Sequence, residues 1–190
     1  MDLAHLIRIR QSVRRYQPKP VEEQILQELI EAVRLAPSAC NSQPWKLILV
    51  NDPDLKNQIA DATFSRAVSF NSFSLEAPVI AVITIEKPKL TAWVGSLIQQ
   101  REYPLIDIGI AASHFCLRAA ELGLGTCMIG WFDEKQVRRL LHIPQDKRIG
   151  LLITLGYADE GYPLRTKNRK EVGQMSGFND YRGAKGTGDE

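Results

Sequence analysis

The stretch Ala36-Pro37-Ser38-Ala39-Cys40-Asn41-Ser42-Gln43-Pro44-Trp45 lies between a segment with helical periodicity and a strongly apolar segment. Its two prolines stiffen the backbone around a set of hydroxyl and amide side chains. Pro44 favours an extended Gln43, and if Asn41 is extended as well, the two amides point the same way. Each amide offers a hydrogen-bond donor and an acceptor, which suits the edge of a flat heterocycle with alternating N–H and C=O groups. Taken alone, the stretch is more simply interpreted as a polar loop that caps the next element.

The residues around this stretch predict an alternation of helices and strands. Apolar residues recur at helical spacing from Val21 to Val33, and Pro37 ends the helix that they predict. The helix predicted over 107–122 is apolar nearly all round, with Asp107 as its N-cap and Gly123 as its stop, so we expect it in the core or at a subunit interface. Further helices are expected over 3–9, 55–62 and 134–141, and strands over 46–50, 78–85, 126–129 and 149–155, the second of them central.

Basic side chains alternate along two segments that lie far apart in the sequence. Arg10, Ser12 and Arg14 would share one face of an extended segment. Two guanidinium groups that flank a hydroxyl form a good phosphate clamp. Lys167 and Arg169 alternate in the same way near the C-terminus and could face the same anion. An ordinary solvated basic stretch explains the first segment as well.

Other residues indicate little further chemistry. Gly130 follows an apolar segment and would let a backbone N–H approach a ligand closely, although an ordinary turn glycine explains it as well. His5, His114 and His142 are widely separated and form no catalytic pattern with a serine or cysteine. The sequence contains no phosphate-binding GxxxxGK motif and no GxGxxG after a strand.

Length and composition narrow the class of protein. The 190 residues suffice for one domain or for a half-share of an intertwined dimer. Their net charge of +2 gives no reason to expect nucleic acid as a partner. The three cysteines are far apart and suggest neither a disulfide framework nor a metal site. We expect no signal peptide, no membrane span and a reducing, cytoplasmic location.

The alternating basic segment, the amide-rich stretch, the glycine turn and the late basic pair could together hold a phosphate at one end and a heterocycle at the other. This combination resembles the FMN-dependent nitroreductase family. Residues 10–16, Arg-Gln-Ser-Val-Arg-Arg-Tyr, are similar to the RxSxRxY/F motif that opens that family. Residues 37–45 are similar to its PSxxNxQPW motif, which is the most specific match. Residues 107–125 are similar to its long interface helix and the GLG turn after it.

The resemblance implies an α+β fold with a central mixed β-sheet flanked by helices. It also implies an intertwined homodimer with FMN at the subunit interface. We expect residues 1–175 to form one FMN-binding domain and residues 176–190 to form a polar C-terminal tail. Carried over by position, the implied FMN-binding residues are Arg10, Ser12, Arg14, Lys167 and Arg169 for the phosphate and ribityl chain, Pro37, Ser38, Asn41 and Gln43 around the ring, and Ile129 and Gly130 near its N5 side.

The resemblance further implies an oxidoreductase in which FMN carries the chemistry and no side chain need act as a general acid or base. NADH or NADPH would reduce the flavin in a ping-pong cycle, and a nitroaromatic, quinone or related conjugated acceptor would then take the electrons. The alternatives are specialised flavin chemistry, such as reductive dehalogenation or flavin cleavage, and a flavin-binding protein without significant turnover. The sequence leaves open the acceptor, the choice between NADH and NADPH, and whether Asn71 contacts the flavin.

Overall fold

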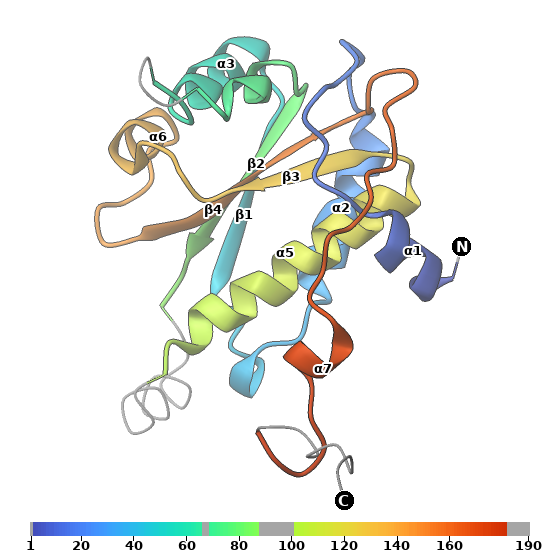
Figure 1. Ribbon diagram of the computed structural model, residues 1–190. Helices are drawn as coiled ribbons and strands as arrows, with labels where there is room; N and C mark the ends of the chain where they lie inside the picture. Colours follow the sequence, from blue (N-terminus) through green and yellow to red (C-terminus); the bar gives the residue numbers. More distant parts are fainter. Residues whose placement is uncertain (1, 66–68, 88–100, 182–190) are drawn as a thin grey trace, which may run out of the picture.

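The computed structural model describes residues 2–65, 69–87 and 101–181, which form a sheet with helices on both faces (Figure 1). The strands are β1 (Trp45–Val50), β2 (Val79–Ile85), β3 (Gly125–Ile129) and β4 (Arg148–Gly156). The α-helices are α1 (Leu3–Ile9), α2 (Glu23–Arg34), α3 (Pro53–Asp61), α5 (Tyr103–Glu121), α6 (Glu134–Leu140) and α7 (Val172–Met175), with short 3₁₀ turns η1 (Ala39–Asn41) and η2 (Ser72–Leu75). The α+β class predicted from the sequence is therefore confirmed.

The strands follow the order β1-β2-β4-β3, and every neighbouring pair is antiparallel. A mixed sheet was expected, so this detail of the prediction is wrong for the four named strands. Hydrophobic patterns show which segments are strands but not whether neighbouring strands run parallel or antiparallel. Either arrangement can bury the same side-chain faces. A parallel bridge joins Ser12 to Thr126 at the outer edge of β3.

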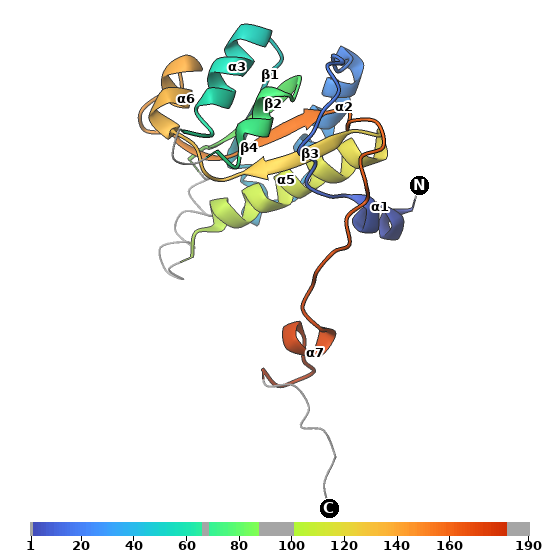
Figure 2. The same ribbon diagram turned by 45° about the horizontal axis from the view of Figure 1, so that its top comes forward.

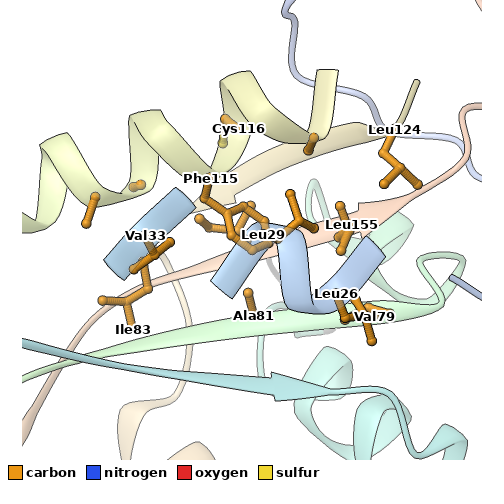
Figure 3. Packing of buried hydrophobic residues seen from close by; sticks show 14 of the residues in the cluster. Leu26, Leu29, Val33, Val79, Ala81, Ile83, Phe115, Cys116, Leu124 and Leu155 are labelled. Carbon is orange, nitrogen blue, oxygen red and sulfur yellow. The ribbon is translucent and has the colours of Figure 1, made fainter. Parts of the chain in front are cut away.

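Strand β2 is central, as predicted, and its side chains alternate between two hydrophobic clusters. Val79, Ala81 and Ile83 face α2 and α5, whereas Ile80 and Val82 face the opposite layer with α3 and α6. All five side chains are at most 1% exposed. Figure 3 shows the first cluster, with residues of α2, α5, β2 and β4 packed together, among them Leu26, Leu29, Val33, Phe115 and Leu155. Each fully buried aliphatic side chain stabilises the fold by about 1.5–3 kcal/mol.

Helix α5 begins four residues earlier than the sequence predicted. Its N-cap is Glu102, and Pro104 occupies the first turn, where a missing N–H costs nothing. Asp107 is therefore not the N-cap; it lies inside the helix and is 4% exposed. At the other end the predicted stop is confirmed, because Gly123 adopts a left-handed φ of 79° that glycine takes without strain.

The segment from residue 10 to residue 16 runs along the outer edge of β3. The Val13 N–H donates to the Thr126 carbonyl at 2.9 Å, and the Val13 side chain is buried. The Tyr16 hydroxyl donates to the Val13 carbonyl and bonds the Thr154 hydroxyl at 2.8 Å. Burial of this phenol raises the pKa of Tyr16 far above its ordinary value, so it stays neutral. These contacts hold the backbone of the alternating basic segment in an extended form.

Residues 163–181, called the C-terminal arm below, leave the body of the protein and carry α7 away from the sheet (Figure 2). The arm carries large apolar side chains that are strongly exposed, including Val172, Met175 and Phe178 at 73%, 68% and 88%. The tail predicted for 176–190 is described only as far as Tyr181, so the remainder of that prediction lies outside the described residues. No helix in the described ranges is long and apolar enough to cross a membrane.

We predict that Gly125→Ala destabilises the fold by about 1–3 kcal/mol, because a Cβ there would lie 2.6 Å from Cγ2 of Val13. Chemical denaturation of the two proteins measures this difference. Gly130→Ala is the matched control, since a Cβ at Gly130 meets nothing within 4 Å. Equal unfolding free energies for Gly125→Ala and the parent would contradict the tight packing of residue 13 on β3.

Candidate functional site

A cavity of about 260 Å³ lies between the basic segment that follows α1 and the start of the C-terminal arm. It is called the basic cavity below. Its lining includes Arg10, Ser12 and Arg14 from the first segment and Lys167 and Arg169 from the second, so the structure brings together all five residues predicted to hold a phosphate. The lining is completed by Gln11, Arg165, Thr166 and Asn168. None of these residues is acidic, and five are cationic.

Tyr162 holds two of these cationic residues in place. Its hydroxyl accepts the Arg14 backbone N–H at 3.1 Å and an N–H of the Arg165 guanidinium at 2.9 Å. The guanidinium carbons of Arg15 and Arg165 both lie 5.6 Å from the centre of its ring, a distance at which cation–π attraction operates. Arg14 itself lies 5.8 Å from the Phe73 ring centre. The basic cavity is thus organised by aromatic side chains as well as by the backbone.

The Lys167 side chain is hydrogen-bonded to the C-terminal end of helix α1. Its ammonium donates to the carbonyls of Ile7 and Arg10 at 2.6 and 2.7 Å, where the last carbonyls of α1 have no partner within the helix. Burial lowers the pKa of Lys167, and the positive charges of Arg10 and Arg169 lower it further. An ammonium has three protons, so one stays available for an anion in the cavity.

The amide-rich loop, residues 37–45, differs from its predicted conformation. Pro44 was expected to favour an extended Gln43, and the two amides were expected to point the same way if Asn41 were extended as well. Both residues instead have left-handed backbones, with φ of 49° for Asn41 and 48° for Gln43, and so does Cys40 at 52°. Left-handed residues other than glycine are uncommon and need support from their surroundings. The Ser38 hydroxyl gives this support by accepting the Gln43 N–H at 2.9 Å.

The two amide side chains of this loop still lie together. The Gln43 amide donates to the Asn41 side-chain carbonyl at 2.8 Å, and both residues are exposed. This bond leaves the Asn41 NH₂ and the Gln43 carbonyl as a free donor and a free acceptor within the pair. Pro37 is also exposed, and Ser38 is half-buried. The loop therefore places the two amides side by side at its surface, with a left-handed backbone in place of an extended one.

Asp107 anchors this loop to helix α5. One carboxylate oxygen accepts the Ala39 N–H at 3.1 Å, and the other, Oδ2, is buried without a hydrogen-bond partner in the described structure. This aspartate was predicted to lie at a helix end, so its contact with the loop was not predicted. Its place between Ile106 and Ile108, within a run of apolar residues, is the signal that could have shown it, because a buried carboxylate needs a donor.

The turn after β3 is the third predicted part of the site. The Ile129 side chain is 2% exposed and belongs to the core, so only its backbone is available to a ligand, whereas Gly130 is exposed. The Asn71 amide donates to the carbonyls of Thr63 and Trp131, which ties η2 to this turn. These hydrogen bonds give Asn71 a structural role, because they join η2 to the turn after β3.

The amide-rich loop and the basic segment lie near opposite ends of α5. The loop contacts Asp107 near the start of the helix, while Arg10 lines a second, small cavity with Ala120 near its end. Ala120 lies thirteen residue steps after Asp107 along the α-helix, which corresponds to about 20 Å. Within one chain, the amide-rich loop and the basic segment therefore lie beside opposite ends of α5.

Metal ligands and thiols provide no further site. The described part of the chain contains no group of three His, Cys, Asp or Glu side chains placed to hold a metal ion. Cys116 and Cys127 are buried, and burial raises the pKa of each thiol, which disfavours the reactive thiolate.

Comparison with known proteins identifies the family. The sequence model described as "Nitroreductase family" matches residues 7–71 and 67–157. A protein named NADH dehydrogenase from Thermus thermophilus is 32% identical over 181 residues, which cover 81% of this chain and 86% of the relative. An oxygen-insensitive NADPH nitroreductase from Helicobacter acinonychis is 30% identical over 157 residues, with 69% and 75% covered. The chain belongs to the nitroreductase family.

A solved structure agrees with this assignment. The FMN-dependent nitroreductase from Clostridium difficile R20291 superposes with a TM-score of 0.75 at 27% identity, covering 94% of this chain and all of that one. The resemblance noted from the motifs at residues 10–16 and 37–45 is thus confirmed at the level of family and fold.

Proposed function

We propose that this protein is an FMN-dependent oxidoreductase that takes electrons from NADH or NADPH and reduces nitroaromatics, quinones or related conjugated acceptors. The observation that carries the proposal is the basic cavity, in which residues more than 150 positions apart in the sequence converge. Family membership and the names of relatives that use NADPH or FMN support it.

The lining of the basic cavity fits a phosphate monoester. Guanidinium groups bind phosphate oxygens through paired, charge-assisted hydrogen bonds, and Arg10 and Arg14 flank the Ser12 hydroxyl. Because no lining residue is acidic, nothing in the lining offsets the positive charge of Lys167 and Arg169, which favours a bound anion. We infer that these groups bind the phosphate and ribityl chain of FMN.

The amide-rich loop fits the pyrimidine edge of the flavin ring. Asn41 and Gln43 would read that edge with the donor and acceptor that their mutual bond leaves free. Pro37 and Ser38 would border the ring, and the backbone at Ile129 and Gly130 would lie near its N5 side. When bound, FMN supplies the transfer of hydride or electrons, so the chain's own residues bind, orient and tune it.

The separation of these two parts supports a homodimer. One chain holds the phosphate-binding and ring-binding groups near opposite ends of α5, and a second copy would bring the missing part of each site. The exposed apolar side chains Val172, Met175 and Phe178 of the C-terminal arm are typical of a segment that packs on another subunit. We therefore propose two FMN sites, each completed across the subunit interface.

Arg10→Ala and Arg169→Ala should each weaken FMN binding roughly 10- to 100-fold, since each removes a charge-assisted contact to phosphate. Fluorescence titration of the flavin measures the Kd. Arg34→Ala is the matched control, because Arg34 is exposed on α2 and paired with Glu31. If both cavity variants bind FMN as tightly as the parent does, the phosphate assignment is wrong.

Anaerobic mixing of the FMN-loaded protein with NADH and NADPH tests the activity itself. We expect the flavin absorbance to bleach with at least one of them and to return when a quinone or nitroaromatic is added. A protein that binds no FMN would contradict the proposal. A protein that binds FMN but is not reduced by either nucleotide would favour the alternative of a flavin-binding protein without turnover.

A further inference from the structure

Gln11 joins the basic segment to the C-terminal arm through both ends of its side-chain amide. Its Nε2 donates to the Pro163 carbonyl at 3.1 Å, and its Oε1 accepts the Arg165 backbone N–H at 2.9 Å. These contacts bridge more than 150 residues of sequence. They are the hydrogen bonds that a neighbouring strand would make to residues 163 and 165, formed here by one side chain.

Only a primary amide of this length offers a donor and an acceptor with the required reach. Aliphatic side chains provide neither group. A carboxylate provides acceptors alone and would add a negative charge to a cavity proposed to bind an anion. The sequence motif gives no special weight to the residue between Arg10 and Ser12, so the role of Gln11 becomes visible only in the structure.

The arm needs such a clamp because its charges oppose docking. Arg165, Lys167 and Arg169 are brought next to Arg10 and Arg14, and like charges at short range repel. The lowered pKa of Lys167 has this repulsion among its causes, after burial. Hydrogen bonds from a neutral amide to the arm's backbone can offset the repulsion without neutralising the charge on which anion binding depends.

We propose that Gln11 is a positioning residue that docks the start of the C-terminal arm, so that its cations face the phosphate of the bound flavin. The inference rests on the proposed function for its ligand, but it assigns a role to a residue outside the cationic set. Gln11 acts on phosphate recognition through Arg165, Lys167 and Arg169, and it leaves the flavin ring untouched.

The test compares FMN with riboflavin, which has the same ring but no phosphate. In Gln11→Met, which keeps the length of the side chain and loses both hydrogen bonds, the FMN Kd should rise roughly 5- to 50-fold while the riboflavin Kd stays within twofold. Gln11→Ala should give the same pattern. Gln17→Met is the matched control: Gln17 donates to the Ala158 carbonyl at 2.7 Å from the same segment but does not line the basic cavity.

Trypsin gives a second readout that needs no flavin. Cleavage after Arg165, Lys167 or Arg169 should be faster in Gln11→Met than in the parent, because the arm has lost two hydrogen bonds to the basic segment and keeps those of Lys167. Equal cleavage rates in the two proteins would contradict the docking role of Gln11.

The outcomes separate the inference from the proposed function. If the parent prefers FMN to riboflavin and the Gln11 variants keep that preference, Gln11 does not position the arm and the inference fails alone. Equal losses for FMN and riboflavin would show a general structural role and would also overturn it. If the parent binds both flavins equally, the basic cavity holds no phosphate and the proposed site fails together with the inference.

Discussion

Burial of β2 on both faces is the constraint on which the rest of the structure depends. A strand that alternates Val79, Ala81 and Ile83 with Ile80 and Val82 can be stable only between two layers of helix. One layer contains α5, whose length separates the amide-rich loop from the basic segment. The other contains η2 and the turn at Gly130. The functional groups therefore lie at the margins of a rigid core, where loops can specialise without loss of stability.

Two unfavourable features occur at those margins, a strained backbone and a cluster of like charges, and nearby hydrogen bonds offset each of them. The amide-rich loop contains left-handed residues at Cys40, Asn41 and Gln43, held by the Ser38 hydroxyl and the Asp107 carboxylate. The basic cavity gathers like charges that are held by Tyr162 and Gln11. In both places, hydrogen bonds from neighbouring polar side chains fix the residues that are proposed to bind the ligand. Such support is typical of preorganised binding sites.

The sequence predicted most elements, because they follow from local periodicity. The convergence of residues 10–14 with 167–169 was implied by the family resemblance, since alternation along each segment does not by itself bring two distant segments together. The sequence did not predict the direction of neighbouring strands, since that direction is set by backbone hydrogen bonding and not by the pattern of side chains. It placed Asp107 at a helix end because aspartate is a common N-cap, whereas the helix begins at Tyr103, with Glu102 as its N-cap and Pro104 in its first turn. It missed the left-handed backbone of Asn41 and Gln43, which depends on Ser38 and on a helix more than 60 residues away.

The central claim is that two copies of the chain complete each FMN site, and mixed dimers test it most directly. One variant carries Arg10→Ala and Arg169→Ala, and the other carries Asn41→Ala and Gln43→Ala. A homodimer of either variant should bind FMN weakly, because each of its sites contains one damaged part. After subunit exchange, a hybrid dimer has one site with both parts intact and one with both parts damaged, so we predict that titration finds one tight FMN site per hybrid. No recovery of tight binding in verified hybrids would contradict the account, because sites built within single chains would all remain damaged.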